Sequence, residues 1–165
     1  MKTSLQVARI LTWLNLIVWG GMLAFMLLFG LAARSAPLII AVFLFSAIPL
    51  HSYASMKLQK SIRHNEIKLN NQTPVGVRFI GFVALFFGLA TMANAYFIIA
   101  DPKTALESMK EAMAETKGLT QADLKSLLQT IAVFILVLGL SVVVNVILNM
   151  RLLRWYYLVK QSDVS

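Results

Sequence analysis

Four long apolar runs, none of which contains Asp, Glu, Lys or Arg, dominate the pattern of hydrophobic and polar positions along this chain. A helix rises 1.5 Å per residue, so about twenty apolar residues can cross the roughly 30 Å hydrocarbon core of a bilayer. The runs extend over Ile10 to Leu31, Pro37 to Met56, Phe79 to Ala100 and Leu127 to Met150. The pattern predicts an all-α integral membrane protein of one domain, residues 1–165, with four transmembrane helices in an up-down bundle.

The polar segments between these runs predict two further features. Asp101 and Pro102 form an N-cap and a first-position proline, so we expect a short amphipathic helix over about residues 102–117. Its apolar face would rest on the bundle or the lipid headgroups, or would dock a partner. The basic segment over about residues 57–78 is expected to continue the second helix past Met56 until the polar residues 70–74 end it.

Composition and charge define the sidedness of the chain. Hydrophobic residues make up 59% of the sequence, above the roughly 45–50% of soluble domains. The two terminal segments and the segment between the second and third runs carry ten Lys and Arg residues against two acidic residues, whereas the opposite side carries five against five. The net charge of +8 therefore belongs to one side. Basic flanking residues are retained in the cytoplasm, so both termini should be cytoplasmic, and a bacterial inner membrane is favoured.

A cleaved signal peptide is the competing interpretation of the first run. The apolar stretch of about twenty residues exceeds the roughly 7–15 residues of a signal peptide's apolar region, which favours a retained helix.

The sequence offers little reactive chemistry. It contains no cysteine, which excludes disulfides and thiolate ligands, and its only histidines are His51 and His64. No acidic residue lies within any apolar run, and no glycine-rich phosphate-binding loop is present. We therefore expect no enzymatic activity, no cofactor and no metal. We also expect no nucleic-acid partner, because membrane topology accounts for the positive charge.

Polar residues inside the apolar runs are the main candidates for a functional site. In the fourth run, Ser141, Asn145 and Asn149 recur every four residues and share one helix face, which should point inward. Depth counting at 1.5 Å per residue places polar residues of three helices about 8 Å from the midpoints of their spans on the same side. The predicted polar layer comprises Asn15, His51, Ser52 and Asn145. It would either join the helices or line a small path in which His51 is the titratable group.

Two more patterns indicate contact surfaces. Small residues at three- and four-residue steps form a packing face on the third run, comprising Gly81, Ala84, Gly88, Thr91 and Ala95. Basic residues after the second run either orient the chain or bind anionic lipid at about 1 kcal/mol per residue. These candidate lipid contacts are Lys57, Lys60, Arg63 and Lys68.

Three functions are compatible with these features. The lack of reactive groups favours a non-enzymatic accessory, assembly or regulatory component of a membrane complex, in contact with the bilayer and with a membrane protein or a second copy. The alternatives are a small channel or facilitator with its constriction near His51, and a protein that binds anionic lipid.

Overall fold

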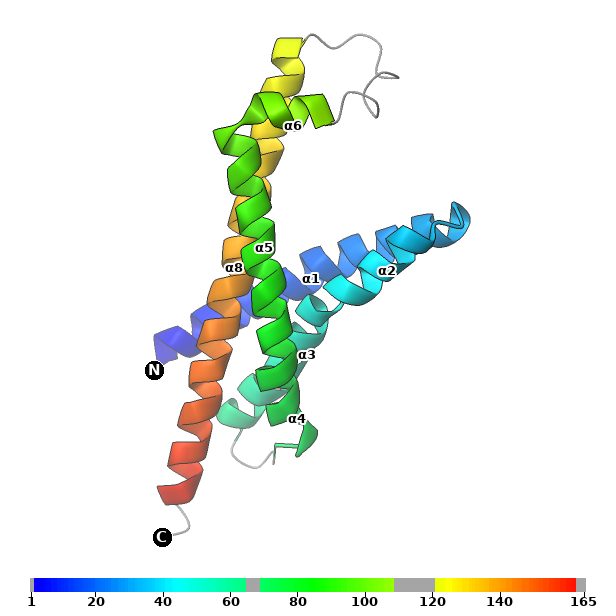
Figure 1. Ribbon diagram of the computed structural model, residues 1–165. Coiled ribbons are helices and arrows are strands. Elements are labelled where there is room, and N and C mark those ends of the chain that lie inside the picture. The colour runs from blue at the N-terminus through cyan, green and yellow to red at the C-terminus, as the bar shows by residue number, and fades with distance from the viewer. Residues whose placement is uncertain (1, 65–68, 109–120, 163–165) are drawn as a thin grey trace. The chain divides into compact units, whose positions relative to one another are not determined.

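The computed structural model describes residues 2–64, 69–108 and 121–162, and these ranges are helical without a strand (Figure 1). The elements are α1 (Lys2–Ala32), α2 (Ala36–Phe45), α3 (Ala47–Arg63), α4 (Gln72–Val75), the π-helical turn η1 (Gly76–Ile80), α5 (Gly81–Ala100), α6 (Pro102–Ser108) and α8 (Gln121–Ser162).

Four helical segments are long and apolar enough to cross a membrane, which confirms the predicted all-α class. They comprise Thr3–Ala32, Ala36–Arg63, Gln72–Ala100 and Ala122–Val159, and each exceeds its predicted span. With 42 residues, α8 is about 63 Å long at 1.5 Å per residue, roughly twice the hydrocarbon thickness of a bilayer.

The chain divides into two compact units. Unit 1 contains Met1–Phe87 and Ser141–Ser165, and unit 2 contains Gly88–Leu140. In unit 1, α1 packs along α2 and α3, which return antiparallel to it (Figure 1). Its hydrophobic core draws residues from α1, α3, η1 and α8, namely Ala8, Ala54, Leu58, Val77, Leu152 and Leu153.

The turn between α1 and α2 is tight and contains a strained residue. Ser35 donates its backbone N–H to the carbonyl of Gly30 at 2.9 Å, and Arg34 donates to that of Leu31 at 3.2 Å. This pair of bonds is the Schellman ending of a helix, which places one residue in the left-handed region. That residue is Arg34, with φ of 51°, where glycine would adopt the same conformation without steric cost.

Pro49 accounts for the break between α2 and α3. Proline has no N–H to donate to the carbonyl four residues earlier, and its ring crowds that turn. The helix accordingly stops at Phe45 and resumes at Ala47. The hydroxyl of Ser46 donates to the carbonyl of Phe43 at 2.6 Å, so the interrupted turn keeps a side-chain hydrogen bond.

The third membrane helix starts earlier than expected. The second helix continues past Met56 as predicted but stops at Arg63, so the expectation that the polar residues 70–74 end it is wrong. Residues 72–74 instead belong to the start of the next helix. The side-chain oxygen of Asn70 accepts the backbone N–H of Gln72 at 3.0 Å. Pro74 lies in the first turn of α4, where a backbone N–H needs no helical partner.

In unit 2, the second half of α5 packs against the first half of α8 through glycines. A Cβ on Gly139 would lie 3.0 Å from the carbonyl oxygen of Gly88 and 2.7 Å from Cγ of Met92. Because these distances are shorter than ordinary contact, only glycine permits this approach of the two backbones.

The helix α6 begins where the sequence predicts. The carboxylate of Asp101 accepts the hydroxyl of Thr104 at 2.7 Å and its backbone N–H at 3.3 Å. These bonds stabilise the charged carboxylate and hold the pKa of Asp101 below its ordinary value. Residues 109–117 of the expected amphipathic helix lie outside the described residues.

Candidate functional site

Four buried polar side chains join α1, α3 and α8 in unit 1, and we call them the polar network. Thr12 donates its hydroxyl to the Asn145 side-chain oxygen at 2.8 Å. The Gln59 amide nitrogen donates to the Thr12 hydroxyl at 2.9 Å and to the Asn149 oxygen at 2.8 Å. Asn149 donates in turn to the side-chain oxygen of Asn145 at 2.9 Å. All four side chains are buried, so their hydrogen bonds form away from water and lipid.

A second pair, Asn15 and Ser141, lies one turn after Thr12 on α1 and one turn before Asn145 on α8. The Ser141 hydroxyl donates to the Asn15 side-chain oxygen at 2.7 Å, and the Asn15 amide donates to the Ser141 carbonyl at 3.3 Å. The oxygen and the nitrogen of the Asn15 side-chain amide therefore both bond to Ser141, as expected for a polar bridge between packed helices.

His51 and Ser52 are buried as well, but they bond within their own helix. Ser52 donates to the carbonyl of Ile48 at 3.0 Å, and Nε2 of His51 lies 3.2 Å from the hydroxyl of Ser55. No hydrogen bond among the described residues therefore joins the four residues of the predicted layer to one another. Asn145 belongs to the polar network, Asn15 pairs with Ser141, and His51 and Ser52 bond to α3.

The imidazole of His51 fits into a slot at the junction of η1 and α5. A Cβ on Gly81 would approach Cε1 and Nδ1 of His51 to 2.8 Å, so the ring occupies the space that glycine leaves. Nδ1 makes no hydrogen bond of good geometry to a described residue, although the backbone of Gly76 and Val77 lies beside the ring. Isolated π-helical turns such as η1 often occur at functional sites.

The small-residue face of the third span is in contact with the rest of the chain. Gly81, Ala84, Gly88 and Ala95 are buried, and Thr91 is half-buried. Gly81 faces His51 in unit 1, and Gly88 faces Gly139 in unit 2. This face is therefore occupied by the protein's own helices.

The chemistry available to the buried residues is hydrogen bonding by amides, hydroxyls and one imidazole. Within residues 2–64, 69–108 and 121–162, no three His, Cys, Asp or Glu side chains gather in a group able to hold a metal ion. The polar network is neutral, and its amides and hydroxyls bond chiefly to one another.

Sequence reasoning missed Thr12 and Gln59 of the polar network. Thr12 lies one turn before Asn15 on α1, and the buried residues Ala8, Thr12, Asn15 and Trp19 follow each other at helical spacing. That spacing was the available signal for Thr12. Gln59 lies beyond the predicted end of the second span at Met56, and no pattern in its neighbourhood marks it as internal.

The candidate lipid contacts are divided by the structure. Lys60 and Arg63 line a cavity of about 400 Å³ between α1 and α3, and Arg9 of α1 lines the same cavity. Lys57 instead places its ammonium 4.6 Å from the ring centroid of Tyr53, a cation–π contact. Lys68 lies outside the described residues.

Comparisons with known proteins provide no functional information about this chain. No protein-family model, no curated protein and no solved structure matches this chain. The four apolar helices establish an integral membrane protein that passes through the membrane several times.

Proposed function

We propose that the protein is a non-enzymatic component of a larger membrane assembly, in an accessory, assembly or regulatory role. The observation that carries this proposal is Asn94, an exposed amide on α5. Asn94 lies six residues before the end of α5 at Ala100, about 9 Å along the helix. At this depth an amide without a partner costs several kcal/mol, so a second protein that bonds it would gain affinity.

The surroundings of Asn94 suit a helix of another protein. Ala93 beside it is exposed, and Ala90 one turn earlier is half-buried, so a partner backbone can approach closely. Phe97, one turn later, is also exposed and supplies apolar contact area. The combination of small residues, one amide and one aromatic ring is typical of helix contacts in membranes.

The polar network supports a structural role for the buried polar residues. A path for a solute needs donors and acceptors that can exchange partners with the solute. Here Gln59, Asn145 and Asn149 bond to each other and to Thr12, and all four are buried. Bonds of this kind hold membrane helices together at about 0.6 kcal/mol each.

Site-specific photo-crosslinking in native membranes tests the proposal. A photoreactive phenylalanine derivative would replace Phe97, and a matched control would replace Phe25, because each side chain is 69% exposed. We expect a protein adduct of constant mass at Phe97, weakened by Asn94→Leu, and only lipid adducts at Phe25. Absence of a protein adduct at Phe97, together with solute flux through the purified monomer in liposomes, would refute the proposal.

The same proposal includes sidedness, with both termini in the cytoplasm of a bacterial cell. The support is the excess of basic residues on one side of the sequence. Because the chain has no cysteine, single cysteines can be introduced without a background. A membrane-impermeant maleimide should label Lys103→Cys in intact cells and should label His64→Cys only after lysis. The reverse pattern would contradict this orientation.

A further inference from the structure

The cavity between α1 and α3 combines positive charge with apolar walls. Its lining comprises Leu5, Gln6, Arg9, Trp13, Met56, Gln59, Lys60 and Arg63. Its volume of about 400 Å³ lies within the range of about 300–1,000 Å³ that small-molecule sites occupy. We call it the basic cavity.

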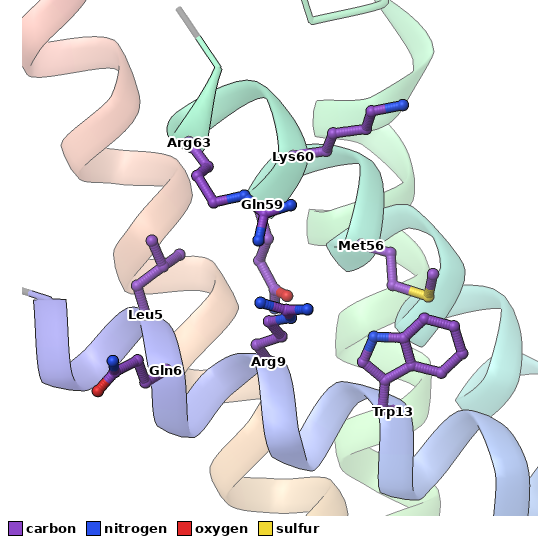
Figure 2. Close-up of a pocket in the computed structure, with 8 residues that line it drawn as sticks. All are labelled: Leu5, Gln6, Arg9, Trp13, Met56, Gln59, Lys60 and Arg63. Carbon is purple, nitrogen blue, oxygen red and sulfur yellow. The ribbon is translucent and has the colours of Figure 1, made fainter.

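Two guanidinium groups converge in the basic cavity. Arg9 from α1 and Arg63 from α3 both point toward Gln59, whereas Lys60 extends away from them (Figure 2). No carboxylate is among the described residues that line the cavity. Two positive charges that face the same space repel each other, and an anion between them would relieve that repulsion. An anion with several oxygens would accept hydrogen bonds from both guanidinium groups.

The apolar part of the basic cavity lies on the hydrocarbon side. Arg9 directly precedes the first predicted span, and Lys60 and Arg63 follow the second, whereas Trp13 and Met56 lie inside these spans. In Figure 2 the indole of Trp13 lies beside the thioether of Met56. The cations therefore lie at headgroup level, and the apolar side chains lie where acyl chains begin.

The geometry points to a binding site for one anionic glycerophospholipid. Arg9 and Arg63 bind its phosphate, Lys60 contributes charge at the rim, and Trp13 and Met56 contact the glycerol and the first acyl carbons. This site is independent of the partner surface at Asn94. It also differs from a diffuse basic surface, because Lys57 lies on the same helix but does not line the cavity.

The polar network holds together the two helices that carry Arg9 and Arg63. Gln59 donates to Thr12 of α1 at 2.9 Å and to Asn149 of α8 at 2.8 Å, which sets α3 against both helices. Arg63 lies one turn after Gln59, and Arg9 lies one turn before Thr12. A site whose walls are held before the ligand arrives loses less entropy on binding.

Fluorescence quenching of Trp13 tests the site in the full-length protein. The chain has three tryptophans, so Trp19→Phe and Trp155→Phe leave Trp13 as the only indole. The protein would be reconstituted in phosphatidylcholine vesicles that contain increasing fractions of brominated phosphatidylglycerol. We expect quenching that saturates at low fractions, and much weaker quenching when brominated phosphatidylcholine replaces the anionic lipid.

Charge variants identify the residues responsible. A basic residue near the surface changes anionic-lipid binding by about five-fold, so Arg9→Gln and Arg63→Gln should each lower the lipid preference about five-fold. The matched control is Lys57→Gln, which removes one charge from the same helix and should retain the preference. An equal loss in Lys57→Gln would show diffuse attraction and would overturn the proposal. Arg9→Lys and Arg63→Lys keep the charge without the planar fork and should give intermediate values.

Two further measurements exclude other occupants. Displacement of the brominated lipid by millimolar inorganic phosphate would show a free-anion site and overturn the assignment to lipid. Glu66 lies outside the described residues, and Glu66→Gln tests whether this carboxylate is the anion that occupies the basic cavity. A marked gain in lipid preference in Glu66→Gln would show that it is, and would overturn the proposal. Native mass spectrometry of the unmodified chain should retain one phosphatidylglycerol, and retention of none would contradict the site without relying on tryptophan variants.

Discussion

The contact between α5 and α8 predicts that Gly139→Ala destabilises the protein, whereas the same substitution at Gly20 does not. Both glycines lie inside long apolar helices, so the chemical change is identical. A Cβ on Gly20 would meet nothing within 4 Å. A Cβ on Gly139 would meet Cγ of Met92 at 2.7 Å, the carbonyl oxygen of Gly88 at 3.0 Å and the backbone nitrogen of Met92 at 3.3 Å.

These distances set the expected magnitude. Ordinary contact begins at 3.4 Å, so the Gly88 carbonyl is about 0.4 Å too close. Rotation of the Met92 side chain cannot relieve a clash with backbone atoms, and the two helices must therefore move apart. Overpacking of this kind costs about 1–3 kcal/mol. Gly20→Ala should leave stability unchanged or raise it by up to about 1 kcal/mol, because alanine favours the helix.

Unfolding by sodium dodecyl sulfate in mixed micelles, followed by tryptophan fluorescence, measures both variants against the parent chain. The free energy of unfolding should fall by about 1–3 kcal/mol in Gly139→Ala relative to Gly20→Ala. Equal stabilities within about 0.5 kcal/mol would refute the close approach of the two backbones. Size-exclusion chromatography of the same samples checks that the effect arises within one chain rather than from dissociation of an oligomer.

Three further predictions concern a polar side chain, a turn and a cap. Gln59→Leu removes the donor to the buried Asn149 oxygen and one of two donors to the Thr12 hydroxyl, so it should lower the free energy of unfolding by about 1–3 kcal/mol. Exposed Gln6→Leu should be neutral in the same assay. Arg34→Gly should raise stability by about 1 kcal/mol, because φ of 51° no longer strains a side chain, and a loss would contradict the assigned turn. The carboxyl carbon of Asp101, followed by NMR, should titrate with a pKa below the ordinary 3.8 and move toward it in Thr104→Ala. Because folding lowers this pKa, the ionised carboxylate contributes to helix stability above pH 3.8. That contribution is lost as the pH falls through the lower pKa of the folded state. Identical titrations of Asp101 in the parent chain and in Thr104→Ala would exclude the cap.

Hydrophobic length was enough to predict four membrane helices, because an uninterrupted apolar run of bilayer thickness has few alternatives to a spanning helix. The ends were less predictable. Residues 70–74 are polar and contain a proline, which is typical of a helix end, yet a new helix begins at Gln72, whose backbone N–H bonds to the Asn70 side chain. The same residue types are common at the ends and at the starts of helices, so composition alone does not fix the boundary.

The buried polar face of α8 could be predicted because Ser141, Asn145 and Asn149 interrupt a run of aliphatic residues at a regular four-residue step. Their partners could not be predicted. Depth counting placed Asn15, His51 and Asn145 in one layer, but hydrogen bonds depend on rotation about each helix axis as well as on depth. In the structure Asn15 pairs with Ser141, and His51 bonds to Ser55 of its own helix.

Gln59 belongs both to the polar network and to the wall of the basic cavity, so it links the two. Its amide nitrogen bonds to Thr12 and Asn149, while the same side chain forms part of the wall of the basic cavity. These hydrogen bonds therefore hold α1 and α3, the helices that carry Arg9 and Arg63, against each other. Two repelling guanidinium groups tend to separate α1 and α3, whereas the polar network opposes that separation. An anionic headgroup between them would remove the repulsion, so lipid binding and helix packing in this unit should stabilise each other.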